Sequence, residues 1–330
     1  MQVEEKMGQF PQFDVVSDIS DHKYFNASSY IQLPAIRAVM KEWKILEKNL
    51  PGGSIFVRAY EGRVDLLRAA IVGPQKTPYH DGLFFFDFQF PNNYPHAPPK
   101  AHYWSFGRCL NPNLYENGWV CLSLLNTWRG PKETRWQPGV STMLQVLVSL
   151  QALVLNHAPL HNEPMILTKL MTTSYTYNDT AFVLTCRTML SLIRTPPRGF
   201  ETLVRNHFGT RAHAILAACQ VYLNGLARVG DYAYGGGLSP RRLFAAASEE
   251  EQRRVVVFSV NSDFKRSLKV EYKALVVALS KHDPSLKGFS KELERMVDDA
   301  VKNSVPPPSF CNLNLLFRRF WEWIWMGSIE

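Results

Sequence analysis

Apolar residues begin to recur at helical spacing from residue 34 onward, whereas the preceding 33 residues show no such period. The repeating positions are Ile36, Val39, Met40, Trp43, Leu46 and Leu50. Steps of three and four residues place these side chains on one face of an α-helix. Pro34 suits a first helical turn, and Pro51-Gly52-Gly53 ends the segment. The pattern therefore predicts an amphipathic helix over residues 34–50.

Short runs rich in β-branched and aromatic residues follow this helix. Three runs cover residues 55–60, 66–73 and 83–90, and a fourth strand is expected at 100–104. Turn-forming stretches rich in Gly and Pro separate the first three runs, as an antiparallel meander requires. We therefore predict a helix followed by a four-stranded antiparallel sheet, which is an α+β fold.

Helical patterns return in the rest of the chain. We expect helices over 143–155 and 178–193, then a break at Thr195-Pro196-Pro197-Arg198-Gly199, then helical segments over 201–229, 262–281 and 288–303, with a glycine-rich loop at 234–237. This order suggests three parts. They are a flexible acidic N-terminal segment (1–33), a core domain (34–199) and a helical C-terminal extension (200–330).

Composition and charge narrow the class of protein. A hydrophobic content of 46% excludes a wholly disordered chain. No apolar run approaches the roughly 20 residues of a transmembrane helix. The aromatic run at 315–325 is predicted to be a helix packed on the body, with an interfacial membrane anchor as the alternative. The net charge of +8 comes without an arginine-rich run, so we expect a protein-docking surface and no nucleic-acid binding.

The cysteines indicate a reducing environment. Five are scattered along the chain without a Cys-x-x-Cys pair, namely Cys109, Cys121, Cys186, Cys219 and Cys311. This pattern favours neither a disulfide framework nor a zinc site. The sequence also opens without a basic segment followed by an apolar one, the pattern of a secretory signal. We therefore expect a cytoplasmic and/or nuclear protein.

One cysteine stands in a distinctive polar block. The block reads Asn111-Pro112-Asn113-Leu114-Tyr115-Glu116-Asn117-Gly118-Trp119-Val120-Cys121-Leu122 and places Cys121 eight residues after Asn113. A single cysteine is most often a small buried hydrophobic residue, and an asparagine in a Pro turn often bonds its own turn. Cysteine is also well suited to acyl transfer, because a thioester forms readily and is easily attacked by an amine.

A loop reading Tyr94-Pro95-His96-Ala97-Pro98-Pro99 precedes this block. The order of helix, meander, Pro-rich loop, Asn-bearing turn and cysteine resembles the ubiquitin-conjugating enzymes over about residues 34–190. The resemblance implies the ubiquitin-conjugating fold with an appended helical region. It implies that Cys121 accepts ubiquitin as a thioester from an activating enzyme and passes it to substrate lysines. ATP is then used by the activating enzyme, and this chain binds no cofactor or metal.

The resemblance also assigns the supporting residues. Asn113 occupies the position of the family's oxyanion-stabilising amide, and a neutral amide donor can stabilise that charge without competing for the proton. The segment 157–164 aligns with an acidic loop that orients the incoming lysine, which makes Glu163 the candidate. Glu163 could equally be a solvated surface residue. His157 or His161 could act as the base instead, or cap the preceding helix.

Two departures from the family pattern stand beside the cysteine. Asn111 begins the turn where the family has His, a residue that mainly scaffolds the turn. In addition, residues 128–135 intervene before Trp136-Gln137-Pro138, where compact members have a short connection. An insertion here resembles the large enzymes that are hybrids of conjugating enzyme and ligase.

The same resemblance suggests where partners bind. Arg37, Lys41 and Lys44 form a basic stripe on the first helix, which is either a solvated face or a contact for the activating enzyme and ligases. His96 and Pro138 match positions of ligase contact. Many members have a bulky aromatic residue at the position of His96, so the usual ligases should bind weakly and intrinsic ligase activity becomes more plausible.

Two other classes of function remain open on the sequence. One is a non-catalytic ubiquitin-binding variant of the same fold, although such variants typically lack the nucleophile that Cys121 would supply. The other is a cysteine hydrolase that pairs Cys121 with His157 or His207, which no spacing in the sequence supports.

Overall fold

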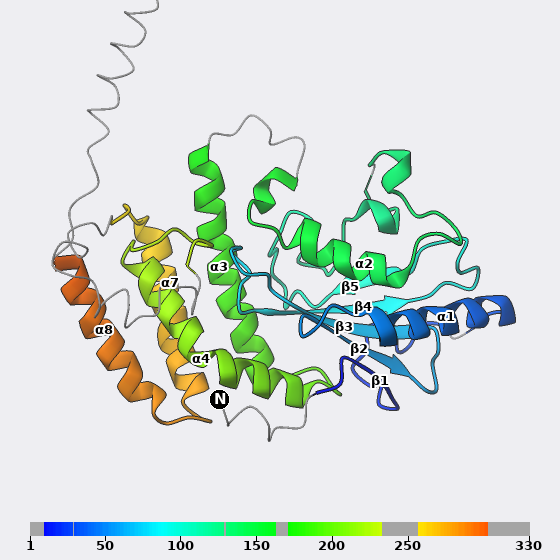
Figure 1. Ribbon diagram of the computed structural model, residues 1–330, viewed down its shortest axis with the longest axis horizontal. Coiled ribbons are helices and arrows are strands. Elements are labelled where there is room, and N and C mark those ends of the chain that lie inside the picture. Colours follow the sequence, from blue (N-terminus) through cyan, green and yellow to red (C-terminus); the bar gives the residue numbers. More distant parts are fainter. Residues whose placement is uncertain (1–9, 29, 129, 163–170, 233–256, 303–330) are drawn as a thin grey trace, which may run out of the picture.

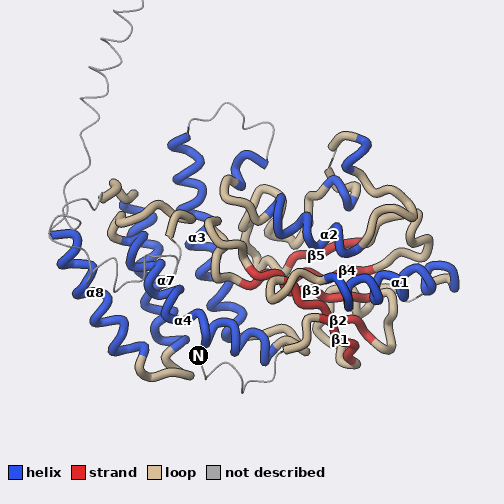
Figure 2. Tube along the Cα trace, viewed as in Figure 1, coloured by secondary structure: helices blue, strands red, loops and turns tan. Residues whose placement is uncertain are grey.

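The computed structural model describes residues 10–28, 30–128, 130–162, 171–232 and 257–302. A five-stranded sheet lies at the centre, with helices on both of its faces (Figures 1 and 2). Glu163, the glycine-rich loop at 234–237 and the aromatic run at 315–325 all fall outside the described residues.

The first predicted helix is confirmed as α1 (Leu33–Asn49). Its apolar positions pack on the sheet, and Val39 and Leu46 are completely buried. Glu42 lies on the same inner face, where its carboxylate accepts hydrogen bonds from the Tyr94 hydroxyl at 2.6 Å and the Met143 backbone nitrogen at 2.9 Å. Burial raises the pKa of Glu42. The helix is thereby fixed both to the Pro-rich loop and to the helix that begins at Met143.

The predicted antiparallel meander is also confirmed. The strands are β1 (Phe13–Val16), β2 (Ile55–Tyr60), β3 (Leu66–Val72), β4 (Leu83–Gln89) and β5 (Lys100–Tyr103), in the order β1-β2-β3-β4-β5. Strands β2 to β5 pair antiparallel in chain order. Every residue of β2 and β4 is buried, because both faces of the sheet are covered.

The N-terminal segment differs from its prediction as a flexible lead. Strand β1 joins the edge of the sheet by parallel pairing with β2, and the following residues cross the sheet face opposite α1. There Arg68 makes an ion pair with Asp21 at 2.7 Å and another with Asp87 at 2.6 Å. Burying a charged side chain is unfavourable unless it is paired, so these contacts anchor residues 13–23 to the core.

The helices that follow the sheet match their predictions in place and type. They are α2 (Met143–Ser149), continued by a π-helical turn (Leu150–Val154), then α3 (Met171–Arg194), α4 (Glu201–Leu223), α7 (Ser262–Leu279) and α8 (Leu286–Lys302). Short 3-10 turns lie at Ser123–Leu125, Lys132–Thr134 and Pro159–Asn162. Among the described residues, none of the helices is both long and apolar enough to cross a membrane.

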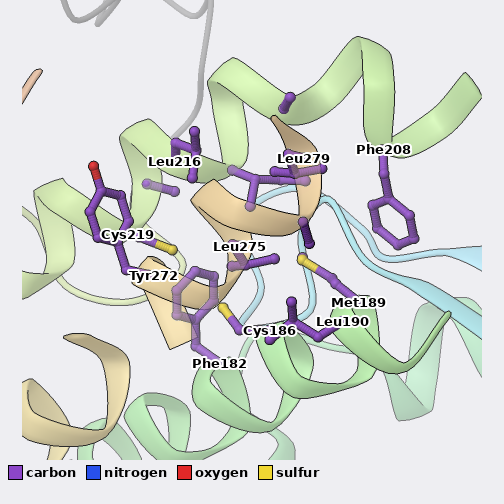
Figure 3. Close-up of a cluster of buried hydrophobic side chains, with 14 of the residues drawn as sticks. Phe182, Cys186, Met189, Leu190, Phe208, Leu216, Cys219, Tyr272, Leu275 and Leu279 are labelled. Atoms are coloured by element: carbon purple, nitrogen blue, oxygen red, sulfur yellow. The ribbon is translucent and has the colours of Figure 1, made fainter. Parts of the chain in front are cut away.

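Alternate residues of the central strands feed two separate cores. Phe84 and Phe86 belong to the core that includes α1 and α2, whereas Phe85 belongs to the core that includes α3, α4, α7 and α8, because neighbouring side chains of a strand point to opposite faces. Figure 3 shows the centre of the second core, where Cys186 of α3 and Cys219 of α4 lie near Leu275 of α7. The C-terminal helices therefore share one core with the sheet, across the boundary predicted at residue 199.

A buried polar cluster joins the same two parts. The Asp81 carboxylate pairs with the His80 ring at 2.8 Å and with the Arg211 guanidinium of α4. The Asp81 carbonyl accepts from the His207 ring at 2.9 Å, and the His80 ring bonds the Tyr222 hydroxyl at 2.9 Å. The loop before β4 is thus tied to α4 by three side chains of that helix.

Candidate active site

The turn before the cysteine is built around the buried side chain of Asn111. Its amide nitrogen donates to the Tyr79 hydroxyl at 2.7 Å and to the Val154 carbonyl at 2.8 Å. Its amide oxygen accepts from the Asn113 backbone nitrogen at 2.8 Å. Asn111 therefore connects the turn to the loop before β4 and to the end of the helical segment after α2, and it scaffolds the turn.

Asn113 and Cys121 are held side by side by two hydrogen bonds. The Cys121 backbone nitrogen donates to the Asn113 carbonyl at 2.8 Å, and the Asn113 side-chain nitrogen donates to the Cys121 carbonyl at 3.1 Å. An amide nitrogen carries two hydrogens, so one remains for a further acceptor. The Asn113 side-chain oxygen is buried without a hydrogen-bond partner in the described part of the chain. The pair thus places an amide donor beside the cysteine.

Thr127 closes the loop that carries Cys121. Its hydroxyl accepts from the Leu122 backbone nitrogen at 2.9 Å and donates to the Val120 carbonyl at 2.7 Å. Its own carbonyl accepts from the Cys121 thiol, with 3.5 Å between sulfur and oxygen. Thr127 was not identified from the sequence, because no motif marks it and its role depends on the fold of this loop. Cys121 itself is 4% exposed.

Two clefts flank the Cys121 loop. The larger has a volume of about 810 Å³ and is formed by the predicted insertion and the residues after it, including Trp128, Lys132, Glu133 and Arg135. The smaller, of about 350 Å³, lies toward β5 and includes Val120 and Thr127 in its wall. Since Val120 precedes Cys121 and Thr127 contacts its thiol, the smaller cleft lies next to the cysteine.

The predicted partner-binding residues all lie at the surface. Arg37, Lys41 and Lys44 are exposed along α1, in agreement with the predicted basic stripe. His96 is exposed in the Pro-rich loop, and Pro138 is exposed in the wall of the larger cleft. Their roles in binding stay predictions.

The three histidines considered as candidate bases lie in two separate parts of the molecule. His157 and His161 are exposed in the segment after α2. His207 lies on α4, with its ring bonded to the Asp81 carbonyl at 2.9 Å, in the part of the molecule that packs against the opposite face of the sheet. This position gives no support to a pairing of Cys121 with His207. In the described part of the chain, no cluster of His, Cys, Asp and Glu could hold a metal ion.

Comparison with known proteins places this fold and turn in a family. The family described as "Ubiquitin-conjugating enzyme" matches residues 38–188. The Arabidopsis thaliana protein named as ubiquitin-conjugating enzyme E2 38 is 49% identical over 241 residues, which cover 71% of this chain and 73% of the relative. The chain belongs to the ubiquitin-conjugating enzyme family.

Other relatives are much longer than the region they share with this chain. The Arabidopsis thaliana protein named as ubiquitin-conjugating enzyme E2 24 is 50% identical over 228 residues, or 66% of this chain and 25% of the relative. Human BIRC6, named as a dual E2 ubiquitin-conjugating enzyme and E3 ubiquitin-protein ligase, is 36% identical over 239 residues, or 65% of this chain and 5% of that protein. The resemblance to hybrid enzymes predicted from the sequence is thus matched by a relative whose name includes both conjugating-enzyme and ligase activity.

Proposed function

We propose that Cys121 accepts ubiquitin from an activating enzyme and transfers it to lysine side chains. The Cys121 sulfur attacks the thioester carbonyl that links ubiquitin to the activating enzyme, whose own thiol leaves. An acceptor amine then attacks the new thioester, an amide bond forms, and the Cys121 thiol is released with the proton that the amine loses. The single observation that carries the proposal is the fixed juxtaposition of Asn113 and Cys121.

Asn113 has a separate role in the second step. Attack by the amine builds negative charge on the thioester oxygen, and an amide donor already held beside Cys121 stabilises that charge without reorganisation. The hydrogen of the Asn113 amide that is not given to the Cys121 carbonyl supplies this contact. Charging by the activating enzyme should therefore depend on Cys121, whereas discharge should depend on both residues.

The test is a charging assay with activating enzyme, ATP and ubiquitin, resolved on gels with and without a reducing agent. We expect a thiol-sensitive ubiquitin adduct on the wild type, no adduct on Cys121→Ala, and a thiol-resistant oxyester on Cys121→Ser. Asn113→Ala should charge normally but discharge to lysine about 10²- to 10³-fold more slowly. Unchanged discharge in Asn113→Ala would refute the oxyanion role. No adduct with ubiquitin or its relatives would favour the ubiquitin-binding variant instead.

Intrinsic ligase activity is a further part of the proposal, supported by the dual name of the BIRC6 relative and by the insertion that walls the larger cleft. The charged enzyme should then modify itself or a substrate without an added ligase. Discharge only after addition of a separate ligase would remove the ligase activity from the proposal.

We also propose a cytoplasmic and/or nuclear setting, in which ATP is consumed by the activating enzyme and this chain needs no cofactor of its own.

A further inference from the structure

The smaller cleft beside Cys121 differs from the larger one because its charged lining residues are all positive. Its charged lining residues are Lys23 and Lys100, both exposed, and no Asp or Glu occurs among the described residues that line it. The larger cleft, by contrast, has Glu133 between Lys132 and Arg135. Burial and then the nearby Lys23 charge lower the pKa of His102 in the smaller cleft. The charge of this cleft at neutral pH therefore comes from its two lysines.

A rigid turn presents a large aromatic ring at this cleft. Trp119 is 50% exposed, and its backbone nitrogen donates to the Asn117 side chain at 2.9 Å. The next residue back, Gly118, has φ of +85° and lies so close to the His102 ring that a Cβ would stand 2.0 Å from it. The Gly118 carbonyl also accepts from the Tyr103 backbone nitrogen at 2.8 Å. These contacts fix the turn against β5 and leave Trp119 half-exposed in the wall of the cleft.

The cleft also lies next to Cys121, within reach of a chain whose lysine approaches the cysteine. Val120 lines it and directly precedes Cys121. Thr127 also lines it, and the Thr127 carbonyl lies 3.5 Å from the Cys121 sulfur. An extended peptide advances roughly 3.3–3.6 Å per residue. A polypeptide whose lysine reaches the Cys121 thioester therefore brings the residues within about three positions of that lysine over the cleft.

We propose that this cleft binds an acidic segment of the acceptor protein, so that lysines with Asp or Glu within about three residues are preferred substrates. Lys23 and Lys100 pair with the acidic side chains, and Trp119 packs against the aliphatic parts of the same segment. The proposal rests on transfer from Cys121 and adds selection of the substrate to it.

The experiment measures single-turnover discharge of the purified, ubiquitin-charged full-length chain. The acceptors are free lysine, a peptide in which Glu residues flank one lysine, and the same peptide with Gln or with Arg in place of Glu. At low salt the wild type should discharge to the Glu peptide about three- to tenfold faster than to the Gln peptide. The preference should shrink at high salt, because exposed charges are screened.

Two charge reversals locate the effect. Lys100→Glu should lose the preference for Glu and favour the Arg peptide, when each rate is divided by the rate of the same variant with free lysine. Lys132→Glu makes the same change of charge in the larger cleft and should keep the preference for Glu. Both lysines are exposed, so neither reversal disturbs the core.

The outcomes separate this inference from the function on which it rests. Equal rates for the Glu and Gln peptides in the wild type overturn it, provided that free lysine is still modified. A preference for Glu that survives Lys100→Glu, or that Lys132→Glu removes equally, also overturns it. Failure of the wild type to charge or to discharge even to free lysine would instead refute transfer from Cys121.

Discussion

Two regions on opposite sides of the sheet differ in the kind of polar contact that holds them together. The turn around Cys121 is held by neutral groups, the amides of Asn111 and Asn113 and the hydroxyl of Thr127. The opposite region is held by ion pairs whose carboxylates are buried. There Arg68 pairs with Asp87 at 2.6 Å and Asp81 pairs with Arg211. The first region positions the cysteine that we propose as the nucleophile, whereas the second joins the terminal parts of the chain to the sheet.

The contrast follows from what each region must do. A buried ion pair is strongly unfavourable to break, because removal of one partner leaves an uncompensated charge. Such pairs are therefore suited to attach the N-terminal segment and α4 firmly to the rest of the fold. The hydrogen bonds that position Cys121 are made by neutral groups, so they place no fixed charge beside the thiol. Stability should therefore depend on the ionic region, and transfer of ubiquitin on the neutral one.

The largest expected effect on stability comes from Arg68→Met. This change leaves the carboxylate of Asp87, which is completely buried, without its main cationic partner. We expect a loss of about 3–5 kcal/mol in the free energy of unfolding, measured by urea denaturation. Arg198→Met is the matched control, since its pair with Asp18 is exposed and its loss should change stability little.

A second substitution sharpens the same comparison. The double variant Arg68→Met with Asp87→Leu removes both charges, so it should recover much of the lost stability. Folded Arg68→Met should still charge with ubiquitin at the wild-type rate, because Arg68 lies outside the Cys121 loop. A double variant as unstable as Arg68→Met would mean that packing, and not the unpaired charge, causes the loss.

The pH dependence of stability should come from the ionic region as well. Burial lowers the pKa of both His22 and His207 below the ordinary value of 6.5. The unfolded chain therefore takes up protons at these sites before the folded chain does, so the free energy of unfolding falls as the pH drops below about 6.5. Each histidine contributes at most about 1.4 kcal/mol per pH unit within this window.

The measurement is urea denaturation at several pH values between 7 and 5. His207→Gln should show a shallower fall than the wild type, whereas His157→Gln, a change at an exposed position, should keep the wild-type slope. An unaltered slope in both His207→Gln and His22→Gln would refute this origin of acid sensitivity. The lowered pKa values of Asp81 and Asp87 act in a more acidic window, because their stabilisation is lost only as pH falls below about 4.

The parts of the fold that sequence patterns predicted are those set by local periodicity. Helix α1 and strands β2 to β5 have clear patterns of their own, and so their order and type could be read directly. Strand β1 is only four residues long, Phe13–Val16, and its partner β2 begins at Ile55. No pattern in the residues near β1 predicts a pairing with a strand so far along the chain. The sharing of one core between β4 and the C-terminal helices is equally non-local.

The candidate site was predictable to a similar degree. The spacing of Asn113 and Cys121 identified the pair, because the motif lies within one short stretch of chain. The role of Asn111 as a scaffold was inferred only in part, since its partners Tyr79 and Val154 come from distant segments. The smaller cleft could not be foreseen, because the fold brings Lys23 and Lys100 together.

The smallest expected effect concerns the neutral region alone. Thr127→Val keeps the shape of the side chain but removes the hydroxyl that bonds Val120 and Leu122. With the loop less firmly held, we expect the rate of discharge to fall about five- to tenfold, which corresponds to about 1–1.4 kcal/mol in the activation free energy and lies within the net contribution of the two lost hydrogen bonds. Thr127→Ser retains the hydroxyl and should discharge at close to the wild-type rate.

Unfolding experiments on the same variants distinguish positioning of the cysteine from loss of fold. If Thr127 acts mainly on the loop, Thr127→Val should also change the rate at which iodoacetamide alkylates Cys121, because its carbonyl contacts the thiol. A loss of stability in Thr127→Val with unchanged alkylation and discharge would assign Thr127 to the scaffold alone. The neutral contacts would then serve folding, as the ion pairs on the opposite face do, and the division of labour between the two regions would not hold.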